Sequence, residues 1–376
     1  MMTRRTRLFV TLAAVLCLLG TAAWAGLDDI VLVRNDGYIF HVNGQTLGSL
    51  GNTSLGMAVS DMKLQSTGDI VAARSDGYVY NLSGNDLSLK AYANWGGPLA
   101  QMVMLSNNNF VGINSASTLY VGSGATMQPT GAWLNIAQPV TAVTALNASP
   151  DLMVAYGNGY VGRLNGSTLN IDTWNNWGDI NRIAAGPTDK LTITNTANTT
   201  YAANSDGTYA GSWVNFGQAI AQLEFRSDGD PCFVLAGGGN IIVRPISNLA
   251  SPLYEMYLGG PNKVAIRPDG SAVAINSAGT AYAMDSHLVY SGLYYPLFGT
   301  VTFMQSQSDG DIVINNTAGD LFLIDGATLA IKGHVIAGYA GITHMAIQDA
   351  VPEPGSLAAL ATGLAGLLGC CLRRRK

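Results

Sequence analysis

Residues 310–329 read GDIVINNTAGDLFLIDGATL, two short apolar runs joined by a turn rich in Asn, Thr and Gly. The first run opens at Ile312, and an apolar residue recurs upstream of it at intervals of 39 to 42 residues. These anchor positions are Ile30, Ile70, Phe110, Leu152, Leu191, Cys232, Ala272 and Ile312. A fixed period of this length is the signature of a repeat architecture, in which each unit packs on its neighbours. The chain is therefore predicted to hold eight copies of one unit.

Each unit repeats a set of turn and side-chain positions after its anchor. A tight turn follows within five to seven residues, as in Asn35-Asp36-Gly37 and Ser75-Asp76-Gly77, and such residues tolerate positive φ angles. The tenth residue is usually aromatic, with Gly162 and Ile242 as exceptions: Phe40, Tyr80, Tyr120, Tyr201, Tyr282 and Phe322. The seventeenth is generally apolar: Leu47, Leu87, Met127, Leu169, Leu249, Val289 and Leu329. A glycine often lies three residues before it: Gly44, Gly84, Gly124, Gly166 and Gly326.

An aromatic-glycine pair closes several units: Trp95-Gly96, Trp177-Gly178, Phe216-Gly217 and Phe298-Gly299. Ile70–Ala73 is apolar throughout, as expected of a strand sandwiched between two neighbours, whereas Tyr78–Leu82 alternates with the period of two of a strand with unequal faces. Each unit thus reads as four short strands, which is one blade of a propeller. The Trp and Phe side chains are expected to wedge between blades, burying on the order of 150–250 Å² each.

The two ends of the repeat region are predicted to complete one blade together. Most units have a strand before the anchor, such as Val301–Met304, but the first unit has too few residues before Ile30 for one. Ile342–Met345 matches Val301–Met304 at the end of the chain, so Ile342–Ile347 should pair with the first unit and bury Met345. This pairing would close the ring and remove its exposed edges. The fold class is therefore all-β, an eight-bladed β-propeller with a split closing blade; a β-solenoid is the alternative architecture.

The units around 77–87 and 319–329 resemble the repeats of quinoprotein-like propellers, with glycine, apolar, aromatic, Asp or Ser, Gly and Leu in order. Quinoprotein enzymes of that family would be expected to bring calcium-binding carboxylates, a catalytic aspartate and often adjacent cysteines. Here Cys232 is the only cysteine outside the two ends of the chain, and only Glu224 and Glu255 are glutamates of the repeat region. The resemblance therefore implies the fold and not quinone-dependent activity.

The last residues form a three-part signal: Pro352-Glu353-Pro354, an apolar run over 357–372, and the basic end Arg373, Arg374, Arg375 and Lys376. The run holds 16 residues, short of the roughly 20 that span a bilayer comfortably, and its basic end should stay cytoplasmic as a membrane stop. This order resembles the PEP-CTERM sorting signal of Gram-negative bacteria. The resemblance implies an exosortase-type processing enzyme as partner, a transient inner-membrane stage and delivery to the cell surface or extracellular matrix. An ordinary single-span anchor is the alternative.

The first residues have the three parts of a secretory signal peptide. Arg4, Arg5 and Arg7 precede an apolar core over 8–19, and Ala23 and Ala25 fit small-residue cleavage. Arg7 lies where a twin-arginine signal usually turns apolar, which favours general secretion. The predicted organisation is a signal peptide at 1–25, the propeller at 26–350 and the sorting signal with its transmembrane helix at 351–376.

Composition excludes nucleic acid as a partner. Residues 26–350 hold 12 Lys and Arg against 23 Asp and Glu, a formal charge of −11, which would repel phosphate. Cys232 has no cysteine to pair with there and lies in an apolar run, so it is expected to be a buried, inert thiol.

No catalytic motif emerges from the repeat region. The histidines His41, His287, His334 and His344 lack ligand spacing, so structural or solvent-facing roles are expected. Gly237-Gly238-Gly239 is in register with a blade turn and is not a phosphate loop. The acidic turns Asp228-Gly229-Asp230, Asp309-Gly310-Asp311 and Gly68-Asp69 could gather carboxylates for calcium, although Asp-Gly is also the favoured hairpin turn.

These observations predict an exported, surface-sorted, non-enzymatic propeller without a resident cofactor. It would bind or organise extracellular material, either exopolysaccharide or a protein partner. The alternative is a carbohydrate-active enzyme that uses the central funnel of the propeller.

Overall fold

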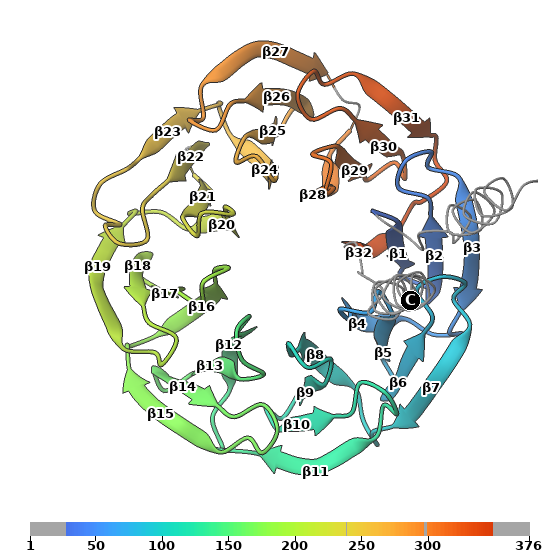
Figure 1. Ribbon diagram of the computed structural model, residues 1–376, viewed down its shortest axis with the longest axis vertical. Coiled ribbons are helices and arrows are strands. Elements are labelled where there is room, and N and C mark those ends of the chain that lie inside the picture. The colour runs from blue at the N-terminus through green and yellow to red at the C-terminus, as the bar shows by residue number, and fades with distance from the viewer. Residues whose placement is uncertain (1–27, 238, 297–298, 349–376) are drawn as a thin grey trace, which may run out of the picture.

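The structure, a computed structural model, describes residues 28–237, 239–296 and 299–348, and these form a closed ring of eight four-stranded antiparallel sheets (Figure 1). The all-β, eight-bladed prediction is confirmed. The predictions for the signal peptide at 1–25, the tail at 351–376, Gly238 and Phe298 lie outside the described residues.

The strands of each blade run from the centre of the ring outward, as Figure 1 shows. Blade 1 consists of β32 (Ile342–Ile347), β1 (Ile30–Arg34), β2 (Tyr38–Val42) and β3 (Ser49–Ser54), and blade 2 of β4 (Val59–Leu64), β5 (Ile70–Arg74), β6 (Tyr78–Leu82) and β7 (Leu89–Asn94). Blade 3 consists of β8 (Leu99–Met104), β9 (Phe110–Asn114), β10 (Leu119–Gly122) and β11 (Pro129–Leu134), and blade 4 of β12 (Val140–Ala145), β13 (Leu152–Tyr156), β14 (Tyr160–Leu164) and β15 (Ile171–Asn176). Blade 5 consists of β16 (Ile180–Ala185), β17 (Leu191–Asn195), β18 (Thr199–Ala203) and β19 (Tyr209–Asn215), and blade 6 of β20 (Ile220–Phe225), β21 (Pro231–Leu235), β22 (Asn240–Val243) and β23 (Tyr254–Tyr257). Blade 7 consists of β24 (Pro261–Ile266), β25 (Ala272–Asn276), β26 (Thr280–Met284) and β27 (Tyr290–Pro296), and blade 8 of β28 (Val301–Ser306), β29 (Ile312–Asn316), β30 (Leu321–Ile324) and β31 (Ile331–Val335).

The anchor positions mark the second strand of every blade. Seven of these strands begin at the anchor itself, and β21 begins one residue before Cys232. In β5 the four residues from Ile70 to Ala73 are fully buried, because alternate side chains meet different neighbours. Ile70 and Ala72 pack with blade 1, whereas Val71 and Ala73 pack with blade 3. A strand with blades on both faces needs apolar residues throughout, which explains the unbroken apolar runs.

The split closing blade is confirmed. β32 pairs antiparallel with β1, with Ile347 opposite Ile30, so both ends of the described chain lie in blade 1. This closure excludes a solenoid. Ile342 and Ile347 are buried, but the expectation for Met345 was wrong. Met345 is only partly buried: it packs against the core between blades 8 and 1 and also lines a pocket on the central channel.

The recurring glycine makes room for an inter-blade clamp. Gln348, which follows β32, donates from Nε2 to the carbonyls of Gly68 (2.7 Å) and Gly84 (3.1 Å) in blade 2. A Cβ on Gly84 would lie 2.1 Å from the Gly68 oxygen and 2.5 Å from the Gln348 amide nitrogen. Gln65 and Gln307 make the same pair of bonds to blades 3 and 1.

The apolar residue three positions after that glycine adopts left-handed backbone angles. Leu47 and Leu87 have φ of 56° and 58°, and both side chains are buried. In blade 7 the residue with this role is Leu288 (φ 57°), which is buried, whereas the predicted Val289 is 60% exposed. The loop there is one residue shorter, so the seventeenth position has already passed the turn.

Two of the closing tryptophans lie between blades as predicted. The indole Nε1 of Trp95 donates to the Met127 carbonyl (2.9 Å), and that of Trp177 donates to the Gly207 carbonyl (3.1 Å), each in the next blade. The same expectation was wrong for tryptophans on outer strands. Trp133, Trp174 and Trp213 are 63%, 36% and 53% exposed, because no further strand covers the outer edge of a blade.

Candidate functional site

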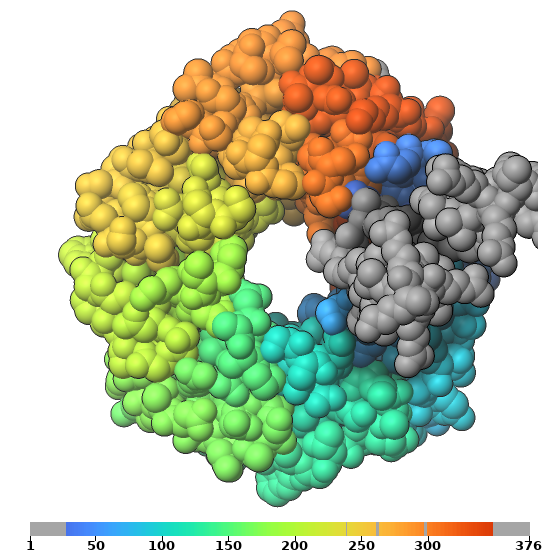
Figure 2. All heavy atoms as spheres, in the orientation of Figure 1, coloured from blue at the N-terminus to red at the C-terminus, as the bar shows by residue number. Residues whose placement is uncertain are grey.

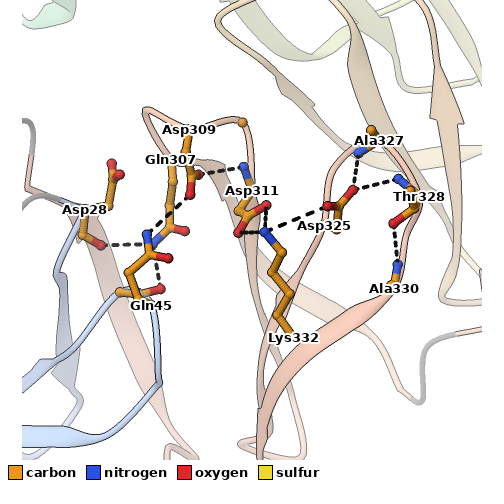
Figure 3. A network of polar contacts seen from close by, with 12 residues as sticks. Asp28, Gln45, Gln307, Asp309, Asp311, Asp325, Ala327, Thr328, Ala330 and Lys332 are labelled. Atoms are coloured by element: carbon orange, nitrogen blue, oxygen red, sulfur yellow. Dashed lines mark hydrogen bonds and ion pairs between the residues drawn. The ribbon is translucent and has the colours of Figure 1, made fainter.

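The acidic turns hold the blades together internally. Asp69 accepts from the Gly84 backbone N–H (3.2 Å) and pairs with the Lys90 ammonium (2.7 Å). Asp311 pairs with Lys332 at 2.6 Å, as Figure 3 shows. Each carboxylate at this position ties the start of a second strand to later residues of the same blade.

These pairings leave the calcium hypothesis without a ligand set. Asp309 faces Gln45 of blade 1, whose amide donates at 3.3 Å, while Asp311 faces Lys332 (Figure 3). Calcium requires six to eight oxygens around one point. Across residues 28–237, 239–296 and 299–348, no cluster of three or more His, Cys, Asp or Glu side chains could hold a metal ion.

The four histidines lie in different surroundings. His41 is buried on β2 with its Nε2 3.1 Å from Asp29 Oδ2. His334 stacks on Phe322 with ring centroids 4.1 Å apart, and His287 is exposed in a turn of blade 7. His344 lies on the inner strand β32, where burial lowers its pKa. His41 and His334 thus make internal contacts, whereas His287 faces solvent.

Cys232 is buried in β21, and burial raises the pKa of its thiol far above the ordinary value. Since the thiolate is the nucleophilic form, this cysteine is held in its unreactive state. The predicted burial of Cys232 is confirmed.

The centre of the ring is open, as Figure 2 shows where grey atoms do not cover it. One pocket of about 380 Å³ opens on the channel wall between the inner strands β20, β24, β28 and β32. Glu224 is the only charged residue among those lining it, and burial raises its pKa. Its two oxygens accept from the Gln222 amide (2.5 Å) and the Ile266 backbone N–H (3.2 Å), so the carboxyl group is fixed to the neighbouring blade.

The outer strands carry an aromatic side chain at one recurring position, which we term the outer belt: Tyr92, Trp133, Trp174, Trp213 and Tyr294. Each is opposite the residue ten after its blade's anchor, in the register of the third and outer strands. Tyr92 and Tyr294 are 55% and 66% exposed, respectively. The sequence analysis missed the belt, although an aromatic 12 or 13 residues after the tenth position was a readable signal.

A pocket of about 470 Å³ adjoins the belt beside blade 3. It lies between the turn that joins β7 to β8 and the strands β10 and β11, and Trp95, Tyr120 and Trp133 line it. Ligand pockets for small molecules have volumes of this order and aromatic walls. The belt and this pocket both expose aromatic side chains on the outer strands.

Comparison with known families places the sorting signal. Residues 350–375 match the family described as the PEP-CTERM protein-sorting motif. The chain is thus exported and sorted to the cell surface through an exosortase. Comparison of the sequence with curated proteins finds no match.

Several solved structures have a similar fold. The chain is similar to dihydro-heme d1 dehydrogenase NirN in complex with DHE, with a TM-score of 0.70 and 14% identity over 85% of this chain and 75% of that one. It is similar to BamB from Moraxella catarrhalis (TM-score 0.59, 10% identity, 78% and 90% covered). It is also similar to the C-terminal WD40 domain of Sif2 (TM-score 0.59, 10% identity, 72% and 83% covered). At such identities the likeness shows the fold alone.

Proposed function

We propose that this propeller is a non-enzymatic binding module that holds extracellular polysaccharide at the cell surface. The observation that carries the proposal is the outer belt, an exposed aromatic at one register position on five blades. Sorting to the cell surface would expose these rings to extracellular material. The rings lie at one register position of their blades, so they offer a series of exposed aromatic contact points around the ring.

Aromatic rings suit a sugar polymer because a pyranose presents an apolar C–H face and polar edges. Covering about 50 Å² of a ring contributes about 1.3 kcal/mol by area bookkeeping, which is weak for a single site. Several rings on one scaffold can engage one polymer chain, and each contact after the first is intramolecular. A ring of blades therefore converts weak contacts into useful avidity.

The channel supports a binding role more than glycoside hydrolysis. Most glycosidases use two carboxyl groups that flank the scissile bond, separated by about 5 to 9.5 Å. The channel pocket is lined by one carboxyl group, that of Glu224, and its oxygens accept hydrogen bonds from blades 6 and 7. The carbohydrate-active alternative would need a second carboxyl group beside it.

A glycan array and a polysaccharide-degradation assay on purified residues 26–350 test the proposal together. We expect binding to one or more polysaccharides without release of reducing ends. Product release that Glu224→Gln abolishes would overturn the non-enzymatic function. Capture of surface proteins with no glycan bound would replace the polysaccharide by a protein partner.

A further inference from the structure

We infer that the pocket beside blade 3 is the site where the outer surface holds one neutral sugar residue, an inference that rests on the proposed polysaccharide binding. Trp95 forms a fixed wall, because its Nε1 donates to Met127 and its ring meets Tyr120 edge-on with centroids 6.2 Å apart. Trp133 also lines the pocket and is 63% exposed. A ring bound here would contact aromatic surface from two neighbouring blades.

The repeat explains why the space is open at this blade. Blades 3, 5 and 7 share an outer-strand pattern with a glycine of positive φ between two equivalent positions: Pro129 and Trp133, Tyr209 and Trp213, Tyr290 and Tyr294. In blade 5 the Tyr209 ring packs against Trp177 (centroids 6.1 Å apart) and Tyr201 (6.3 Å). Blade 3 has Pro129 where blade 5 has Tyr209, so its pocket lacks the tyrosine ring that occupies the equivalent space.

Glycines keep the pocket clear on its other sides. A Cβ on Gly96, Gly97 or Gly131 would meet no other atom within 4 Å, although all three line the pocket. Gly96 and Gly131 have positive φ, which accounts for glycine there, but Gly97 does not. A side chain at Gly97 would therefore project into open space without a clash with the described residues.

The pocket offers hydrogen-bonding groups suited to hydroxyl groups. The side-chain amide oxygen of Asn114, Oδ1, accepts from the backbone N–H groups of Ala116 and Thr118, both at 3.0 Å. This fixes the side chain, while its Nδ2 makes no hydrogen bond within the described part of the chain. Ser115 and Tyr120, two residues that carry hydroxyl groups, also line the pocket. Neutral donors and acceptors beside aromatic faces match the edges and faces of a hexose.

Charge selects a neutral sugar over an acidic one. No residue that lines the pocket is charged, so a uronate or sulfate group would be desolvated there without a partner. Several basic side chains elsewhere on the ring pair within their own blades, as Arg74 does with Asp76, Arg163 with Asp151 and Lys332 with Asp311. The net charge of −11 over residues 26–350 adds long-range repulsion of polyanions.

The test compares affinity electrophoresis of the wild type, Pro129→Tyr and Gly97→Leu in gels that contain neutral polysaccharides (a β-glucan or a galactomannan) or anionic ones (alginate or polygalacturonate). Pro129→Tyr gives blade 3 the residue that blade 5 already accommodates, and Gly97→Leu fills the pocket from another side. Gly51→Leu on β3 is the matched control, because a Cβ there also meets nothing within 4 Å. Thermal melts verify that each variant is folded. If one of the two blocking variants does not fold, the other is sufficient for the test.

We expect retardation of the wild type by a neutral polysaccharide, independent of salt, and at least a fivefold weaker affinity for both blocking variants, with Gly51→Leu unchanged. Undiminished binding by a folded blocking variant would show that the pocket does not hold the sugar. Polysaccharide binding by the outer belt would still be supported in that case if a variant with alanine at Tyr92, Trp133 and Trp213 lost binding. Preference for alginate or polygalacturonate would overturn the neutral class. A wild type that no polysaccharide retards would instead refute the proposed function itself.

Discussion

At the residue scale, the glycine and the apolar residue that recur three positions apart in the repeats are explained by a crowded turn between blades. Gly84 lies where the carbonyl of Gly68 and the amide of Gln348 meet, so a side chain has no room. Three residues later Leu87 has a φ of 58°, a conformation that costs a non-glycine residue about 1–3 kcal/mol. Burial of the leucine side chain contributes about 1.5–3 kcal/mol and offsets that strain. Glycine and leucine are therefore required for different reasons at the two positions.

Gly84→Ala should destabilise the ring, because its Cβ would overlap the Gly68 carbonyl oxygen at 2.1 Å. Overpacking of this kind typically costs about 1–3 kcal/mol. Urea unfolding of the variant measures the loss, with Gly51→Ala as the control, since its Cβ meets no neighbour and should change stability by less than about 0.5 kcal/mol. Equal losses for the two variants would contradict the close approach at Gly84.

Glu224 should make stability depend on pH. Burial raises its pKa above the ordinary 4.5, so between 4.5 and the folded-state pKa the folded protein binds more protons than the unfolded chain. The free energy of unfolding should therefore fall as pH rises through that window. Glu224→Gln removes this contribution, so the stability of the variant relative to the wild type should increase with pH. Urea unfolding from pH 4 to 8 measures the difference, and a constant difference would contradict a raised pKa.

At the element scale, the sequence predicted inner and second strands well and outer strands poorly. The second strands are covered on both faces, so an unbroken apolar run such as Ile70–Ala73 indicates a buried strand from the sequence alone. An outer strand is covered on one side only, so the same residue type can be buried or exposed at or beside it. Trp95 lies between blades whereas Trp133 faces solvent, and only the three-dimensional arrangement distinguishes them. The spacing of the outer belt is visible in the sequence, but which of its rings face solvent, and the pocket beside blade 3, could not be predicted for that reason.

β32 should contribute more to stability than any single side chain, because it supplies the inner strand of blade 1 and buries Ile342 and Ile347. Truncating one buried isoleucine to alanine costs about 2–5 kcal/mol, so loss of the whole strand should cost more. A chain ending at Gly341 should melt well below one ending at Ala350 and expose the edge of β1. Equal melting temperatures would contradict closure through this strand.

At the scale of the whole molecule, a closed ring presents its outer strands around the full circumference, and the C-terminal signal sends that ring to the cell surface. The described residues include no helix long and apolar enough to cross a membrane. The fold, the closure and the sorting motif followed from sequence because each has a local pattern. A ligand does not, since recognition depends on which side chains of different blades end up together.

Processing of the sorting motif should remove the tail. Pro352 and Pro354 lack amide protons and disfavour helix, which should leave Glu353 accessible to an exosortase. Cells with an exosortase should yield surface protein ending near residues 351–354, and cells without it should retain the basic residues 373–376. Intact-mass spectrometry of both preparations measures this. Surface protein that still carries Lys376 in the first strain would reduce the tail to an ordinary anchor.

The most direct test of polysaccharide binding by the outer belt is isothermal titration of the polysaccharide selected on the glycan array. The wild type is compared with a variant in which Tyr92, Trp133 and Trp213 are all alanine. These side chains are at least half exposed, so the variant should fold with stability close to that of the wild type. We predict a loss of affinity of at least about tenfold, because each ring contributes about 1 kcal/mol and 1.4 kcal/mol is a factor of ten. A folded variant that binds as tightly as the wild type would contradict polysaccharide binding by the belt.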